Sequence, residues 1–145
     1  MKYRTSLEAP CNKSALFGWV DDLADYHQWL TIIASATPVE PNEGKLAWDM
    51  ELRARVGPFA RSKRLRMVRT EFEIDRHVRF VRCENDGRSH SDWDLRADVE
   101  STSCGSLLTM QLEYGGSLWG PILSSLLDDE IERAKARLLD IVGPG

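Results

Sequence analysis

The sequence is poor in cysteine and histidine and has no long hydrophobic run. Its three cysteines, Cys11, Cys83 and Cys104, lie far apart and form no C-x-x-C pair, which argues against a disulfide framework and a zinc knuckle. We expect all three to be reduced and buried, like small hydrophobic residues. The three histidines lack the H-x-x-x-H spacing of metal ligands, so we expect no metal and no cofactor.

Targeting and membrane segments are also missing from the sequence. No stretch approaches 18 uncharged apolar residues, and residues 1–8 lack the apolar centre of a signal peptide. We therefore expect a soluble cytoplasmic protein. With 42% hydrophobic and 29% charged residues, intrinsic disorder is excluded as the main state. The length of 145 residues predicts one domain, residues 1–145, with a substantial core.

Charge is unevenly distributed along the chain. Residues 53–82 include ten basic and three acidic residues, a net charge of +7. Because the whole chain has a net charge of −4, the remainder carries −11. The outward face of two predicted strands carries a basic cluster made of Arg53, Arg55, Arg64 and Arg66. Such a cluster attracts nucleic acid, anionic lipid or an acidic protein. The pI of 5.4 argues against a specific nucleic-acid partner. Two interpretations of the cluster remain: a solvated outer face and transient contact with a membrane surface.

Alternation of polar and apolar residues predicts seven strands. The clearest strand runs from Leu46 to Val56, where every second residue is apolar. The other predicted strands cover residues 2–8, 31–40, 62–74, 78–84, 93–99 and 108–114. Turn residues at Gly57-Pro58 and at 85–87 separate neighbouring strands. The loop at residues 57–59 is a candidate for a homodimer contact or for a gate over an interior cavity.

Helical periodicity appears in two places. Apolar residues at three- and four-residue steps predict a helix over residues 13–24, followed by a short helix over residues 25–30. A long apolar stripe predicts a helix from Trp119 to Val142, with Pro121 in its first turn. The element order is strand, two short helices, six strands and one long helix. Its simplest packing is an α+β fold in which a bent antiparallel sheet grips the C-terminal helix.

Two segments resemble a known superfamily. Residues 22–30, DLADYHQWL, resemble the D-L-x-x-Y-x-x-W-L segment of the SRPBCC (START/Bet v 1-like, polyketide cyclase/dehydrase) superfamily. Residues 115–122, GGSLWGPI, resemble the start of the long helix in small actinobacterial members. The resemblance implies a helix-grip fold with an interior cavity for lipids, sterols, polyketides or similar apolar molecules. Some members cyclise or dehydrate a polyketide, others bind or transfer their ligand, and a few small bacterial members are described as toxins.

The parity of the strands and the stripe of the helix define the residues that would face such a cavity. The same parity places Tyr3 and Leu65 inward. Bulky residues of this kind can also fill the interior at close-packed density, so an open cavity and a filled core are both compatible with the pattern. The candidate ligand-binding residues are Tyr26, Trp29, Trp48, Met50, Leu52, Met67, Phe80, Trp93, Leu95, Leu108, Met110, Leu112, Trp119, Ile122, Leu123 and Leu126.

Charged residues in the inward register are candidates for chemistry. Continued alternation places Arg69 and Glu71 inward on one strand and Arg82 and Glu84 inward on the next. Buried charges must pair, hold a polar group of a ligand, or lie beyond a bulge or at a solvated strand end. Arg69 and Arg82 are the candidates for anchoring a carboxylate or an enolate.

Among the side chains that titrate near neutrality, His27 is the best acid–base candidate, because it lies beside Tyr26 and Trp29 near the expected cavity mouth. His77 and His90 fall in turn-like segments and are expected to be exposed.

The sequence therefore favours binding, and transport, of a hydrophobic small molecule over catalysis, because no convergent acid–base pair is visible. A cyclase or dehydratase of polyketides is the first alternative. A toxin-like or regulatory protein that acts through a protein partner is the second. A nucleotide site is excluded at Gly115–Gly120, because Pro121 and Ile122 replace the Lys and Ser/Thr of a P-loop.

Overall fold

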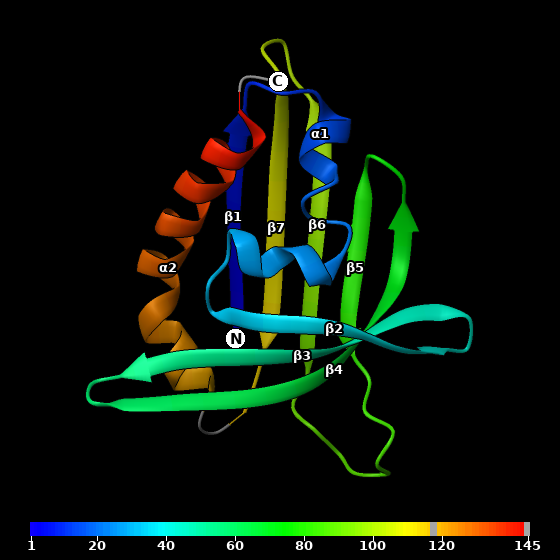
Figure 1. Cartoon of the computed structure of the whole chain (residues 1–145), viewed down its shortest axis with the longest axis vertical. Coiled ribbons are helices and arrows are strands. Elements are labelled where there is room, and N and C mark those ends of the chain that lie inside the picture. The colour runs from blue at the N-terminus through cyan, green and yellow to red at the C-terminus, as the bar shows by residue number, and fades with distance from the viewer. Residues whose placement is uncertain (117–118, 144–145) are drawn as a thin grey trace.

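The structure is a computed structural model that describes residues 1–116 and 119–143, without the side chain of Val56. Within these residues, seven antiparallel strands form one sheet in the order β1-β7-β6-β5-β4-β3-β2 (Figure 1). Every neighbouring pair is antiparallel, so the predicted α+β fold with a seven-stranded antiparallel sheet is confirmed. The strands are β1 (Lys2–Ala9), β2 (Ile33–Asn42), β3 (Lys45–Val56), β4 (Phe59–Glu73), β5 (His77–Arg82), β6 (Trp93–Ser101) and β7 (Ser106–Tyr114).

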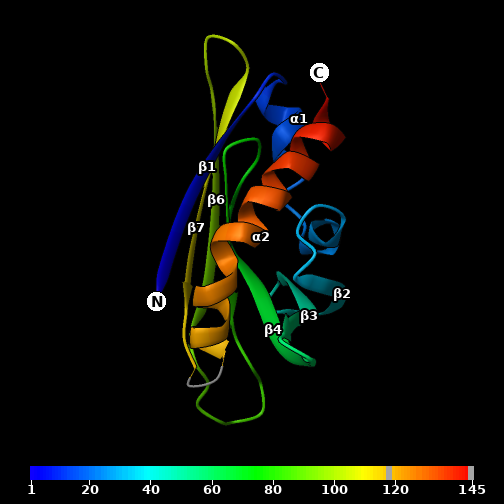
Figure 2. The ribbon, with the colours of Figure 1, turned by 90° about the vertical axis from the view of Figure 1, so that its left-hand side faces the viewer.

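The sheet is strongly bent. β1, β7 and β6 run side by side, whereas β2, β3 and most of β4 cross them at a steep angle (Figure 1). After a quarter turn, the helices are seen on the concave side of this bend, between the two halves of the sheet (Figure 2). The inward side chains of all these strands therefore face one interior.

The long helix α2 (Trp119–Val142) lies across the concave face of the sheet (Figure 2). Its buried residues Leu123, Leu127, Ala134 and Leu138 follow helical spacing and form the stripe that packs on the sheet. The predicted bounds of this helix are confirmed. Ser117 and Leu118 of the segment that resembles actinobacterial members lie outside the described residues.

The predicted helix over residues 13–24 is wrong, because the segment is broken in the middle. α1 (Lys13–Phe17) ends at Gly18, and a 3-10 helix, η1 (Leu23–Gln28), takes the place of the second short helix. Asp22 has an extended backbone, with φ −128° and ψ 119°, and its side chain accepts a hydrogen bond from Ala24 N. An N-cap residue of this kind begins a new helix, so a continuous helix cannot pass through it.

A β-bulge in β4 changes the predicted register. The pairing with β5 shifts between Arg69 and Glu71, so that Arg69 pairs with Phe80 while Glu71 pairs with Arg79. The extra residue at the bulge moves Glu71 to the outer face, where its side chain is exposed. Of the alternatives left open for the charges in the inward register, the bulge therefore applies to Glu71, which does not point inward, whereas Arg69 keeps the inward register.

Two of the three cysteines differ from the expectation. Cys11 is buried, but Cys83 and Cys104 are exposed. Cys83 directly follows β5, and Cys104 lies in the turn between β6 and β7, so both belong to connections at the ends of strands. Among the residues that the structure describes, no helix combines the length and the apolar character needed to cross a bilayer.

Candidate functional site

An apolar cavity lies between the sheet and α2. The space open to the centre of a water-sized sphere is about 80 Å³. Its floor is the inward face of β1, β3, β4, β6 and β7, and α2 and the segment between η1 and β2 close it. The lining residues are Tyr3, Thr5, Trp29, Leu30, Ile32, Ile33, Met50, Leu52, Met67, Trp93, Leu95, Met110, Gln111, Leu112, Leu123, Leu127 and Ile131.

The volume defines what this cavity can hold without rearrangement. A single water needs roughly 10–15 Å³ on this measure, and a dry cavity of about 150 Å³ holds benzene. The space of about 80 Å³ therefore exceeds one water several-fold but is smaller than an aromatic ring requires. A ligand larger than a few heavy atoms needs a displacement of α2 or of the segment before β2.

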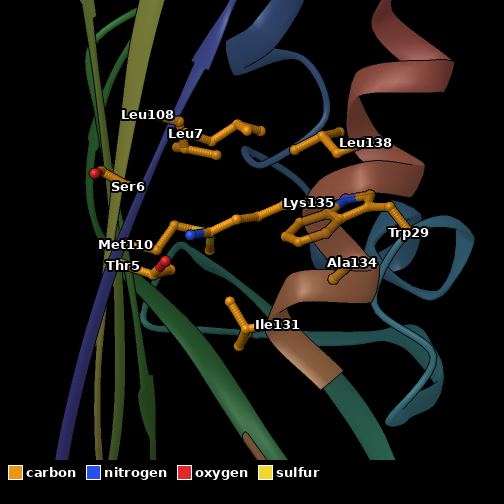
Figure 3. A pocket seen from close by; sticks show the side chains of 10 residues that line it. All are labelled: Thr5, Ser6, Leu7, Trp29, Leu108, Met110, Ile131, Ala134, Lys135 and Leu138. Carbon is orange, nitrogen blue, oxygen red and sulfur yellow. The ribbon is translucent and has the colours of Figure 1, made fainter. Parts of the chain in front are cut away.

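A second, smaller cavity of about 20 Å³ continues the space toward the other end of α2. It shares Thr5, Trp29, Met110 and Ile131 with the larger cavity. Figure 3 shows Lys135 reaching from α2 toward the sheet, where its amino group ends near Thr5 and Met110. The ammonium is also 3.4 Å from Glu132 Oε1, so the positive charge at this end is partly balanced.

Most lining residues follow from the sequence pattern. The structure places these candidate ligand-binding residues at the larger cavity: Trp29, Met50, Leu52, Met67, Trp93, Leu95, Met110, Leu112 and Leu123. Leu108 lines the smaller cavity. Sequence reasoning missed Thr5, Leu30, Ile32, Ile33, Gln111, Leu127 and Ile131. Thr5 shares the parity of Tyr3, and Leu127 and Ile131 continue the stripe of Leu123, so these three had a signal in the sequence.

Other candidates fill the core instead of lining the cavity. Tyr26 and Trp48 pack against the ring of Phe80 at centroid distances of 6.2 and 5.4 Å, both nearly edge to face. This aromatic cluster closes the interior below η1. Leu126 lines an open groove between β3 and α2. Trp119 is buried in the core, and Ile122 is partly buried and packs against it.

Arg69, a candidate anchor for an anionic ligand, is engaged by the protein. Its guanidinium carbon lies 4.0 Å from the centre of the Phe72 ring, and Nη1 donates to the carbonyl oxygen of Asp21 at 3.4 Å. The bulge places Phe72 on the same face as Arg69, which makes the stacking possible. Arg69 is not among the residues that line the cavity.

Arg82 is also held by protein groups. Its side chain is 8% exposed, and Nε donates to Glu84 Oε2 at 2.7 Å. Nη1 donates to Oγ of Ser91 at 3.2 Å, and Nη2 lies 3.3 Å from Nδ1 of His90. The inward register predicted for Arg82 is present, since it pairs with Met67, but its donors face these partners.

The histidines lie away from the larger cavity. His27 is exposed, and its Nδ1 lies 2.9 Å from the carbonyl oxygen of Ala24. His77 was expected to be exposed but is half-buried on the outer face of β5, between Glu71 and Asp98. His90 is exposed, as expected, and contacts Asp86. In the described part of the chain, no three His, Cys, Asp or Glu side chains are arranged to hold a metal ion.

The predicted basic cluster is interleaved with carboxylates. Arg64 lies 2.9 Å from Asp49, and Arg53 lies 2.9 Å from Glu51. Arg66 donates to the carbonyl oxygen of Cys83 at 2.8 Å. The outer face of β3 and β4 therefore carries a smaller excess of positive charge than the arginines alone indicate.

Comparison with known proteins identifies the fold. No family model and no curated protein matches the sequence. A START superfamily protein from Mycobacterium smegmatis superposes with a TM-score of 0.68 at 16% identity, over 97% of this chain and 96% of that one. The chain has the helix-grip fold of the START superfamily. A protein from Thermus thermophilus gives a TM-score of 0.69 at 14% identity, over 99% of this chain and 100% of the other. A protein from Chromobacterium violaceum gives a TM-score of 0.68 at 16% identity, over 99% of this chain and 98% of the other.

The resemblance of residues 22–30 to this superfamily is therefore confirmed at the level of the fold. START-like folds generally bind hydrophobic ligands. In this chain, the apolar cavity lies within that architecture, between the sheet and α2.

Proposed function

We propose that this protein binds, and carries, a hydrophobic small molecule such as a lipid or a polyketide in the cavity between the sheet and α2, which is enlarged by displacement of α2 or of the segment before β2 when the ligand binds. The observation that carries this proposal is the apolar lining of about 80 Å³ of open space. Ligand sites are concave, mostly apolar and furnished with few polar groups, and this cavity has that character. The START-like fold supports the same function.

We further propose that the ligand enters beside Ile32. This residue lines both the cavity and the open groove between β3 and α2, so its side chain separates the two spaces. Arg53, Arg55 and Arg133 also line the groove, together with Glu130, which pairs with Arg133, so the rim keeps a reduced excess of positive charge. A basic rim of this kind fits transient contact with an anionic membrane surface during loading.

The alternatives have weaker support. A polyketide cyclase or dehydratase needs an acid, a base or an anion anchor at the cavity. His27, Arg69 and Arg82 are instead engaged with protein groups outside its lining. A toxin-like protein that acts through its basic cluster is disfavoured because Asp49 and Glu51 pair with that cluster.

The proposal is tested by native mass spectrometry of protein purified without detergent, followed by denaturing extraction. We expect a stoichiometric apolar molecule to be released. Leu112→Trp replaces an isobutyl group by a larger indole at the cavity and should reduce the bound fraction. Leu107→Trp on the same strand is the matched control, because Leu107 pairs with Glu8 and Glu100 on the outer face.

The outcome against the proposal is equally specific. Bare protein, together with an unchanged thermal midpoint in the presence of a fatty acid, a sterol, a quinone and an aromatic polyketide, would show that the cavity is a packing defect. Equal ligand loss in the Leu112 and Leu107 variants would place the ligand elsewhere.

A further inference from the structure

The hairpin formed by β3 and β4 extends beyond the rest of the sheet. The register of β2 on β3 reaches only Leu52, and the register of β5 on β4 begins only at Met67. Outside these points β3 and β4 pair with each other alone, as far as Val56 and Phe59. Figure 1 shows this two-stranded ribbon projecting past α2. The end of the hairpin, residues 55–61, therefore has no further strand beside it, and we call it the hairpin tip.

An aromatic side chain lies uncovered at the hairpin tip. Phe59 is 61% exposed, and its neighbours Gly57, Pro58 and Ala60 are also exposed. The guanidinium carbon of Arg61 lies 5.8 Å from the centre of the Phe59 ring, without covering it. A single exposed aromatic is ordinary on a protein surface, so its meaning depends on the charges around it.

Basic side chains surround this aromatic. The sequence from Leu52 to Thr70 contains seven basic residues and no acidic one. Arg55 pairs with Ala60 across the ribbon, and Arg61 pairs with Ala54. Successive residues of a strand point to opposite faces, so Arg55 and Arg61 lie at nearly the same level on opposite faces of the ribbon. Both side chains are exposed. The hairpin tip therefore carries positive charge on both faces.

Carboxylates begin only farther back along the hairpin. Glu51 lies 2.9 Å from Arg53, and Asp49 lies 2.9 Å from Arg64. α2 contributes Glu130 to the adjoining groove, where it pairs with an arginine of its own helix. Along the hairpin, the order is thus an apolar tip, then two arginines that form no ion pair within the described part of the chain, and then neutralised pairs.

This order matches the layers of an anionic membrane. Strand residues are spaced about 3.4 Å apart, so Arg61 lies about 7 Å behind Phe59 along the ribbon. The headgroup layer of one leaflet is about 5–7 Å thick. When Phe59 reaches the hydrocarbon boundary, Arg55 and Arg61 are therefore level with the lipid phosphates. Basic residues at this level are attracted to anionic lipid.

We infer that the hairpin tip docks on an anionic lipid bilayer, with Phe59 inserted at the hydrocarbon boundary and Arg55 and Arg61 on lipid phosphates. This surface is separate from the cavity, and its docking requires no ligand there. Arg55 also lines the groove beside Ile32. Docking by the hairpin tip therefore brings the proposed entrance of the cavity close to the membrane.

Two other partners match the hairpin tip less completely. A nucleic-acid duplex offers phosphates to the arginines but no apolar layer to Phe59. A second copy of this chain offers an apolar contact to Phe59, but it brings two identical sets of arginines together, and like charges repel. The bilayer satisfies the apolar and the basic residues at once.

Vesicle flotation tests the inference with vesicles of phosphatidylcholine alone and of an equal mixture of phosphatidylcholine and phosphatidylglycerol. Phe59→Ala removes the apolar side chain, and Ile74→Ala is its control, because Ile74 is 72% exposed in the turn between β4 and β5. The double variant Arg55→Gln and Arg61→Gln removes the cations. Thermal unfolding verifies the fold of each variant.

A second double variant, Arg4→Gln and Arg88→Gln, is the control for charge. Both arginines are exposed and lie outside the hairpin, so the net charge changes equally in the two double variants.

We expect the wild-type protein to bind the mixed vesicles and to bind phosphatidylcholine alone at least about tenfold more weakly. Loss of Arg55 and Arg61 should weaken binding to the mixed vesicles about 25-fold, because each basic residue near the surface contributes about fivefold. Phe59→Ala should weaken binding about tenfold by removing buried apolar surface. Both controls should stay within about twofold, and raised salt should weaken wild-type binding.

The depth of the hairpin tip is measured by NMR with a nitroxide-labelled lipid in nanodiscs. The amide signals of Gly57 and Phe59 should broaden before that of Gly87, which lies in another exposed turn. Broadening of Gly87 first would overturn the inference, because the membrane would then contact a different end of the molecule.

Four further results overturn the inference. The first is equal binding by the double arginine variant and its charge control. The second is equal binding to both kinds of vesicle. The third is a dimer without vesicle binding that Phe59→Ala dissociates, which assigns the hairpin tip to a second copy. The fourth is binding of duplex DNA, without vesicle binding, that the arginine variant loses and Phe59→Ala keeps, which assigns it to nucleic acid.

Failure of this inference and failure of the proposed function are distinguishable. A released apolar ligand without vesicle binding leaves the proposed function standing and overturns the inference. Vesicle binding through the hairpin tip by protein that releases no ligand supports the inference and leaves the cavity without its proposed role.

Discussion

Asp22 Oδ1 accepts a hydrogen bond from Trp48 Nε1 at 3.1 Å and a second from Ala24 N at 2.9 Å. One carboxylate oxygen therefore caps η1 and satisfies an indole on β3 that is 26 residues away in sequence. Trp48 in turn packs on Phe80 at the centre of the sheet. This contact attaches the helix pair to the sheet beside the cavity.

Asp22→Ala should lower the free energy of unfolding by about 2–3 kcal/mol, because it removes the cap and leaves a buried indole N–H unpaired. Asp22→Asn keeps an acceptor and should cost less. Urea denaturation measures both. Asp25→Ala, on the same 3-10 helix, is the control and should change stability by less than about 0.5 kcal/mol. Equal losses at Asp22 and Asp25 would contradict this assignment.

Removal of Glu84 should be strongly destabilising, because it leaves Arg82 without its carboxylate. The Arg82 side chain is 8% exposed and lies 2.7 Å from Glu84. Loss of one partner of a buried pair costs about 3 kcal/mol, so Glu84→Ala should lower the unfolding midpoint in urea. Glu113→Ala is the control, since its partner Lys2 is 82% exposed and lies 3.8 Å away, and exposed pairs contribute about 0–1 kcal/mol. A loss at Glu84 no larger than at Glu113 would refute the prediction.

Stability should depend on the protonation of His77. Burial lowers the pKa of its imidazole, but the hydrogen bonds and charges of Glu71 and Asp98 outweigh burial and raise the pKa above its usual value. The ring nitrogens lie 2.8 Å from Glu71 and 2.7 Å from Asp98. A group whose pKa is higher in the folded state than in the unfolded state stabilises the fold. This stabilisation is complete at pH values below the unfolded pKa and is lost as pH rises through the folded pKa.

The free energy of unfolding should therefore fall between roughly pH 6.5 and the folded pKa of His77. His77→Gln should remove this part of the pH dependence. His27→Gln should retain it, because the ring of His27 contacts the carbonyl oxygen of Ala24 instead of a carboxylate. Titration of the ring protons by NMR measures the pKa directly, and a value below about 6.5 would be incompatible with the two carboxylate contacts.

Gly105 should tolerate no side chain. A Cβ at this position would lie 2.1 Å from the carbonyl oxygen of Ala9, a backbone atom that cannot move aside alone. Gly105→Ala should therefore cost at least about 2 kcal/mol. Gly87→Ala is the comparison, because Gly87 has a φ of +73° but no atom within 4 Å of its added Cβ. Backbone strain there should cost about 1 kcal/mol, and similar losses at both sites would contradict the close approach at Gly105.

Much of the fold could be predicted from local pattern. The alternation in residues 46–56 and the helical stripe of residues 119–142 place these elements correctly, because each pattern has a single period over many residues. The break at Asp22 was missed because its extended backbone is stabilised by Trp48, which is distant in sequence. A bulge was one of several alternatives for the charges in the inward register, and the sequence did not choose among them because an extra residue leaves no mark in the alternation before it.

The sequence by itself determined which side chains face the interior. Strand parity and helix spacing placed Met50, Leu52 and Leu123 on inward faces, and the structure finds them at the cavity. Only the tertiary structure decided which inward residues leave open space. Tyr26 and Trp48 close on Phe80, whereas Trp93 borders the cavity. Close packing and hydrogen-bond pairing depend on the positions of several elements at once, and a one-dimensional pattern does not contain those distances.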